Sequence, residues 1–82
     1  MKLKRLLCNP TPRGETWPIG WQTLDGRFEI EEQKFHGSPV WWRLRDTSGK
    51  RKLSVHEREH DTLHEAKECI QLILNEEAGI VD

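Results

Sequence analysis

The segment that most constrains the fold is Val40–Arg45, which reads Val-Trp-Trp-Arg-Leu-Arg. Apolar positions recur with a period of two, and β-branched and aromatic residues favour extended backbone, so this segment is predicted to be a β-strand. One face then carries three apolar side chains that are predicted to be core: Val40, Trp42 and Leu44. The opposite face carries an indole ring beside two guanidinium groups: Trp41, Arg43 and Arg45. The sequence therefore predicts one buried face and one face that is free for a partner.

Two further segments fit strands of the same sheet. Arg27–Glu31 follows an Asp-Gly turn signal, and Lys52–His56 follows a second turn after the tryptophan strand. The alternating inward positions of both segments are apolar: Phe28, Ile30, Leu53 and Val55. Because the connections are short, the three strands are predicted to form an antiparallel meander.

The last third of the chain has the pattern of an amphipathic helix. Thr62–Glu65 fits a capping box, and Gly79 is a natural helix stop. Apolar residues recur between them at helical spacing: Leu63, Ala66, Ile70, Ile73 and Leu74. Ser54–Glu57 fits the same capping pattern, and no Pro or Gly interrupts residues 54–78, so a helix that begins near Ser54 is the alternative. The start near Thr62 is preferred because the apolar stripe is continuous only from Leu63 onward.

These elements predict an α+β fold, a three-stranded antiparallel β-meander with one C-terminal helix packed on one face. Residues 21–82 are expected to form this single β-β-β-α domain. Residues 1–20, which are rich in turn signals, are expected to form an irregular N-terminal arm. Residues 1–14 hold four basic and no acidic residues in a chain of net charge −1. The arm is therefore expected either to bind an anion or to fold back on the acidic body.

His56–His60 reads His-Glu-Arg-Glu-His and matches the H-E-x-x-H motif of zinc enzymes, with His64 as a third imidazole. That chemistry needs both histidines on one face of a helix. The preferred assignment places the motif at a strand end and in a loop, and 82 residues leave little room for a substrate cleft. The motif is interpreted as incidental, and a small zinc protein with ligands His56, His60 and His64 remains the remote alternative. We predict no cofactor, no catalytic residue and no enzymatic activity.

Two cysteines, Cys8 and Cys69, are too few for a disulfide framework and are expected to be free thiols. No segment is long and apolar enough to span a membrane. A cytoplasmic location is therefore expected.

The candidate binding residues lie on the outer side of the predicted sheet: Trp41, Arg43, Arg45 and Lys52. Exposed Trp and Arg are enriched at the energetic centres of protein interfaces, which favours a protein partner. A sheet can also enter the major groove of DNA, so a module that reads duplex DNA is the alternative. A third interpretation is a self-neutralised surface, in which two glutamates face the two arginines across the strands. It requires Ile30 to pair with Leu44, with Glu29 opposite Arg45 and Glu31 opposite Arg43.

Three segments carry a resemblance to a known group of proteins. They read Trp21-x-x-Leu-Asp-Gly-Arg-Phe-Glu-Ile, then Val-Trp-Trp-Arg-Leu-Arg-Asp, then Asp-Thr-Leu-His-Glu-Ala-Lys, and together they lie within residues 21–74. This pattern resembles the small accessory proteins encoded by bacteriophages of actinobacteria. The resemblance implies a phage-borne β-β-β-α protein that acts on a host protein in the host cytoplasm, and it brings no catalytic residues.

The order of three strands and a helix is also similar to two groups of DNA-binding domains. These are the arm-site domains of tyrosine integrases and the plant ethylene-response domains, which grip the major groove with the sheet. Such domains are basic, whereas this chain has a net charge of −1.

Overall fold

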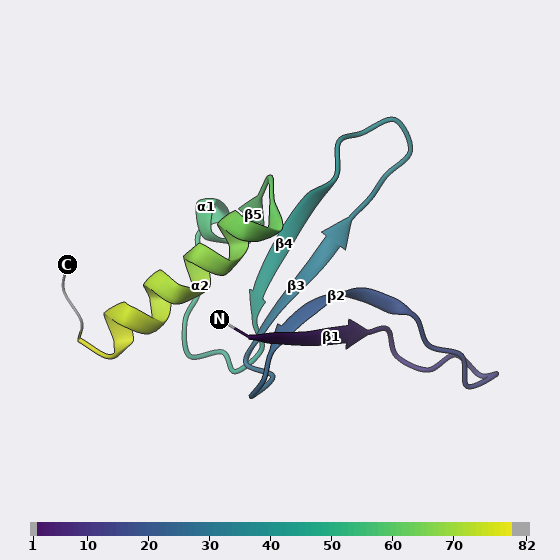
Figure 1. Ribbon diagram of the computed structural model, residues 1–82, viewed down its shortest axis with the longest axis horizontal. Helices are drawn as coiled ribbons and strands as arrows, with labels where there is room; N and C mark the ends of the chain where they lie inside the picture. The colour runs from purple at the N-terminus through teal and green to yellow at the C-terminus, as the bar shows by residue number, and fades with distance from the viewer. Residues whose placement is uncertain (1, 80–82) are drawn as a thin grey trace.

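The computed structural model describes residues 2–79 (Figure 1). Five strands form one antiparallel sheet in chain order, β1-β2-β3-β4-β5. They span β1 Leu3–Leu7, β2 Pro18–Thr23, β3 Phe28–Gln33, β4 Trp41–Asp46 and β5 Glu59–His60. The helices are α1 Val55–Arg58, between β4 and β5, and α2 Leu63–Glu77, after β5. The predicted α+β class, antiparallel sheet and C-terminal helix are confirmed, whereas the predicted number of three strands is wrong.

The predicted third strand at Lys52–His56 is wrong, because residues 55–58 form the helical turn α1. Ser54 caps this turn with a complete capping box. Its hydroxyl accepts from the amide of Glu57 at 3.3 Å, and the Glu57 carboxylate accepts from the amide of Ser54 at 3.0 Å. The strand next to β4 is instead the two-residue β5, which pairs with Trp42 and Arg43. Two reciprocal hydrogen bonds outweigh the weak apolar alternation of this segment.

The prediction of an irregular arm is wrong for residues 3–7 and 18–20. β1 pairs with β2 along its whole length, with Leu3 opposite Thr23 and Leu6 opposite Gly20. The expected domain boundary near residue 20 therefore falls inside β2. Residues 3–7 belong to the sheet, as an arm that folds back on the body would.

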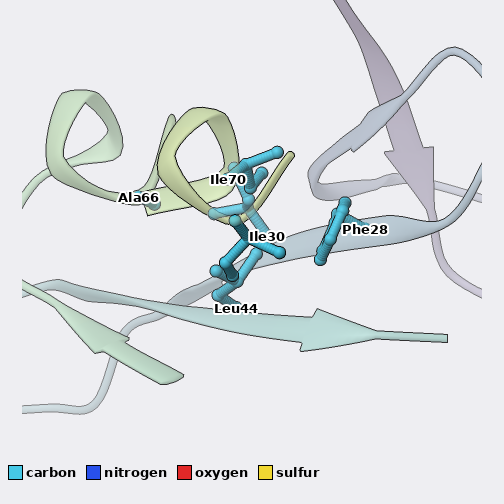
Figure 2. Packing of buried hydrophobic residues seen from close by; sticks show 6 residues of the cluster. Phe28, Ile30, Leu44, Ala66 and Ile70 are labelled. Carbon is cyan, nitrogen blue, oxygen red and sulfur yellow. The ribbon is translucent and has the colours of Figure 1, made fainter. Parts of the chain in front are cut away.

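The core lies between one face of the sheet and α2 (Figure 2). Its buried members are at most 2% exposed and come from β3, β4 and α2: Phe28, Ile30, Leu44, Ala66, Ile70 and Ile73. The predicted inward positions Phe28, Ile30 and Leu44 and the predicted helix stripe are thus confirmed. Val40 and Val55, which were predicted to face inward, are exposed because they lie outside the strands.

α2 begins at Leu63, after its cap Thr62, as the preferred sequence assignment predicts. The Thr62 hydroxyl accepts from the amide of Glu65 at 3.1 Å. The Glu65 carboxylate accepts from the amide of Asp61 at 3.2 Å, one residue before the position that a capping box requires. The helix ends at Glu77, two residues before Gly79, which has a φ of 76°.

Two hairpins, β1–β2 and β3–β4, diverge from one another toward their tips (Figure 1). β2 and β3 pair only over residues 20–22 and 29–31. At this junction a Cβ on Gly20 would overlap the carbonyl oxygen of Ile30 and would lie 2.9 Å from the Cα of Glu31. Only glycine lets the two hairpins approach each other this closely.

A buried ionic contact ties α2 to the sheet. Arg27 donates to Asp46 at 3.1 Å and to Glu77 at 2.6 Å, so it links the start of β3, the end of β4 and the end of α2. The side chain of Asp46 is 1% exposed. The last turn of the helix is therefore held to the sheet by charge as well as by apolar packing.

Candidate functional site

The sheet face opposite α2, called the outer face below, carries the side chains that alternate with the core residues. Ile30 lies opposite Leu44, which is the register that the self-neutralised interpretation requires. Two glutamates consequently face two arginines: Glu29 opposite Arg45 and Glu31 opposite Arg43. The outer face therefore has an acidic strand, β3, beside a basic strand, β4.

Only one of the two arginines of β4 is neutralised in this way. Arg45 forms an ion pair with Glu29. Arg43 has no ion pair among residues 2–79, and its guanidinium lies 5.7 Å from the centroid of the Trp41 ring, in a cation–π contact. Glu31 accepts instead from the side-chain amide of Gln33 at 3.4 Å. The self-neutralised interpretation thus holds for Arg45 and fails for Arg43.

Trp41, Arg43 and Arg45 line one hollow of about 490 Å³, together with Leu44, Arg58 and Glu59. This basic hollow brings three arginines and an indole together. Arg58 comes from the last position of α1, and no carboxylate within the described part of the chain pairs with it. Sequence reasoning missed Arg58 because it placed this segment in a loop. The capping pattern at Ser54 was the available signal, since a helical turn that begins there ends at Arg58.

Lys52, the fourth predicted binding residue, lies in the loop between β4 and α1 rather than in a strand. It lines an adjoining hollow of about 240 Å³, which also includes Arg45 and Arg58. The structure therefore brings all four predicted residues into one continuous region and adds Arg58 to it.

A second hollow, of about 610 Å³, adjoins the basic hollow. Its lining residues come from the β3–β4 connection, β4, β5, the turn before α2 and the first turn of α2: Ser38, Pro39, Val40, Trp41, Glu59, His60, Asp61 and Glu65. Three of these carry carboxylates, so we call it the acidic hollow. Trp41 and Glu59 line both hollows and form the ridge between them.

The H-E-x-x-H segment does not form one helix. α1 ends at Arg58, and His60 belongs to β5, so His56 and His60 do not share a helical face. Nε2 of His60 lies 2.8 Å from the carbonyl oxygen of Glu57. His64 is on α2, where it pairs with Glu68 at 2.8 Å. In residues 2–79, no three His, Cys, Asp or Glu side chains are grouped so that they could hold a metal ion.

The glutamate of this segment is engaged in structural contacts. A hydrogen bond from the amide of Ser54 lowers the pKa of Glu57, and Arg51, at 2.8 Å, lowers it further against the opposing effect of burial. Glu57 is therefore held as an anion between a helix cap and an arginine, which makes it a poor proton acceptor.

Both cysteines are free thiols. Cys8 accepts from the amide of Trp17 at 3.4 Å, at the loop end of the β1–β2 hairpin. Burial raises the pKa of Cys69, which reduces its fraction of reactive thiolate.

The other three tryptophans line a separate groove of about 480 Å³: Trp17, Trp21 and Trp42, with Arg5, Pro18, Ile19, Gly20, Glu32 and Lys34. The guanidinium of Arg5 already stacks on Trp21, 4.3 Å from the ring centroid. Trp42 also packs against the core, as its predicted inward position requires. Trp41 is therefore the tryptophan that belongs to the predicted binding region.

Comparisons of the chain with family models, with curated proteins and with solved structures found no match. Within the described residues, neither helix combines the length and the apolar character that crossing a bilayer requires.

Proposed function

We propose that the protein is a small, non-enzymatic binding protein that engages an acidic segment of a protein partner at the basic hollow. The observation that supports this proposal most strongly is the convergence of Trp41 with Arg43, Arg45 and Arg58 on one hollow. Among the described residues, Arg43 and Arg58 have no carboxylate partner. The planar guanidinium matches a carboxylate with two hydrogen bonds, and Trp and Arg contribute most of the energy of many protein interfaces.

The resemblance of residues 21–74 to accessory proteins of actinobacterial bacteriophages supports a phage origin for the protein. On this proposal the partner is a protein of the bacterial host, and the encounter takes place in the host cytoplasm.

The test combines capture with a measured affinity. Tagged protein is incubated with an actinobacterial lysate, the captured protein is purified, and its Kd is measured by isothermal titration calorimetry. We expect the double variant Trp41→Ala, Arg43→Ala to raise the Kd at least about 30-fold, since one such interface residue contributes roughly 2 kcal/mol or more.

The matched control is Trp17→Ala, Arg13→Ala, which removes the same residue types from the β1–β2 hairpin, where both are exposed. This control is expected to keep the Kd unchanged. If the Trp41 variant captures the same partner with equal affinity, the partner binds another part of the molecule and the proposal is wrong.

A duplex DNA-binding module is the second candidate. It is favoured by the position of Lys52 beside Arg45 and Arg58, which extends the row of cations along the edge of β4. The carboxylates of Glu31 and Glu59 on the same region oppose a phosphate backbone, and we therefore rank this function second.

The DNA candidate is tested with a fluorescent duplex of ~20 bp, in salt from ~50 to ~200 mM. Binding that weakens steeply with salt and is lost in the variant Arg43→Ala, Arg45→Ala, Lys52→Ala would establish it. Absence of detectable binding at ~50 mM salt would exclude it, because phosphate contacts are strongest at low ionic strength.

A further inference from the structure

The charges around Trp41 have opposite signs on its two sides. The basic hollow, with Arg43, Arg45 and Arg58, lies on one side of the Trp41–Glu59 ridge. The acidic hollow, with Asp61 and Glu65, lies on the other. The two hollows are of similar size, about 490 and 610 Å³. One surface of this chain therefore presents both halves of a charge-complementary contact.

The ridge between the hollows also carries apolar surface. Trp41 is half-buried, and Val40 next to it is 38% exposed, with Pro39 in the same lining. An aromatic and aliphatic centre with charged groups around it has the composition of a protein interface.

We propose that a second copy of this chain docks on this surface as a two-fold symmetric dimer. In a two-fold interface the same patch serves both subunits, so each group meets its complement on the other copy. An axis that crosses the ridge places the acidic hollow of one copy against the basic hollow of the other, twice, with Trp41 of both copies near the axis. A second copy therefore complements both hollows at once, whereas a partner of a single charge would complement only one of them.

The dimer does not depend on the proposed function, although both use the basic hollow. An acidic partner and a second copy would compete for Arg43 and Arg58. Self-association would then lower the fraction of binding sites that are free as the protein concentration rises.

Sedimentation velocity of the full chain, from ~10 μM to ~1 mM, provides the first measurement. We expect a monomer–dimer equilibrium at ~50 mM salt, with a dissociation constant at least about 10-fold weaker at ~500 mM salt, because screening weakens exposed charge pairs. Trp41→Ala is expected to abolish dimerisation while circular dichroism shows an unchanged fold.

Charge reversal supplies the decisive measurement. The variant Arg43→Glu, Arg58→Glu makes both hollows acidic, and the variant Glu59→Lys, Asp61→Lys makes both basic. Each variant alone is expected to be monomeric, and an equimolar mixture is expected to form a heterodimer, because mixing restores opposite charges at both contacts. Neither side chain changed in the second variant makes a hydrogen bond or ion pair in the described part of the chain.

The matched control is Lys2→Glu, Lys34→Glu, which changes the net charge as much as the first variant does but at residues outside both hollows. It is expected to dimerise like the unmodified chain. A monomeric unmodified chain at ~1 mM in ~50 mM salt, or a mixture that stays monomeric, would overturn the dimer. In that case, a weaker affinity of the Trp41→Ala, Arg43→Ala variant for the captured partner would still support the proposed function. The two proposals can therefore be rejected independently.

Discussion

Single residues control two junctions of this fold, and at one of them the important feature is a missing side chain. Gly20 of β2 lies so close to the backbone of Ile30 and Glu31 in β3 that a Cβ at this position would overlap it. Backbone atoms cannot rotate away as a flexible side chain can. A methyl group at this position must therefore push the two hairpins apart.

Gly20→Ala is expected to lower the free energy of unfolding by about 3 kcal/mol, measured by urea denaturation, because the overlap is with main-chain atoms. The control is Gly14→Ala in the loop between β1 and β2. Gly14 has a φ of 79° and no neighbouring atom within 4 Å of a Cβ. That control should cost only about 1 kcal/mol, from the left-handed backbone alone. Equal costs for the two variants would show that the close approach at Gly20 has no energetic weight.

Arg27 controls the second junction through its charge. Burial raises the pKa of Asp46, but hydrogen bonds from Arg27 and Ser48 outweigh it, so the pKa of this carboxyl is lowered. The hydrogen bond from Arg27 lowers the pKa of Glu77 as well. Both carboxyls thus have lower pKa values in the folded chain than their ordinary values of 3.8 and 4.5. Their stabilisation is complete above these ordinary values and is lost as the pH falls through the folded pKa values.

Arg27→Met is expected to reduce stability at pH 7 by about 2–3 kcal/mol, since it leaves the buried Asp46 carboxylate without its cation. The same variant should differ less from the unmodified chain near pH 3, because this pH lies below the ordinary pKa values of both carboxyls and their stabilisation is already being lost there. Urea denaturation at both pH values measures this. Arg45→Met is the control, because the Arg45 side chain is 63% exposed and its pair with Glu29 should contribute less than about 1 kcal/mol. A pH-independent difference for Arg27→Met would contradict the ionic explanation.

At the scale of elements, α2 has one face that packs on the sheet and one that does not. Ile70 is fully buried in the core against the sheet, whereas Leu72, two residues later, is 58% exposed. The helix is therefore held to the sheet by a narrow apolar stripe, and the exposed Leu72 adds little to the stability of the isolated chain.

Ile70→Ala is expected to cost about 3–4 kcal/mol, because it removes a buried side chain and leaves a cavity. Leu72→Ala makes a change of equal size on the same helix and should cost less than about 0.5 kcal/mol. Thermal and urea unfolding of both variants distinguish the two faces. Comparable losses would mean that α2 is rotated relative to the sheet or that Leu72 is covered by another molecule.

At the scale of the whole molecule, the β1–β2 hairpin is part of the sheet and not an appendage. Leu6 is 7% exposed, and Leu3 packs against the core. An 82-residue domain has little stability to spare. The chain should therefore fold only when its first strand is present.

Deletion of residues 2–8 is expected to abolish cooperative folding, seen as loss of amide dispersion in NMR spectra. The variant Lys2→Ala, Lys4→Ala keeps the strand and removes only its charges, and it should give a dispersed spectrum. A dispersed spectrum of the deletion variant would show that the remaining four strands and two helices suffice.

The parts of the fold that the sequence predicts correctly are those with a local periodic signal. Alternation in Phe28–Ile30 and in the tryptophan strand predicts β3 and β4 and their inward faces, and the Thr62 cap with its apolar stripe predicts α2. β1 and β2 escape prediction because Pro18 and Gly20 interrupt the pattern and because β1 is recognised only through its partner strand. Pro18 is tolerated since it occupies the first position of β2.

In the candidate site, too, the residues with a periodic signal are predicted and those without one are not. Trp41, Arg43 and Arg45 come from one periodic strand, and alternation alone places them on a common face. Arg58 and the acidic hollow arise from α1, β5 and the turn before α2, where two short signals compete within a few residues. Whether this segment forms a strand or a helical turn depends on the hydrogen bonds of Ser54 with Glu57, and periodicity cannot reveal these.

The close contact at Gly20 also bears on ancestry. On the proposed function, Trp41 and Arg58 belong to a binding surface, which is expected to change in relatives of this chain as their partners change. The requirement at Gly20 comes from main-chain geometry and is indifferent to the identity of any partner. Divergent homologues should therefore keep a glycine six residues before the glycine of the Asp-Gly turn, long after their surfaces have ceased to resemble this one.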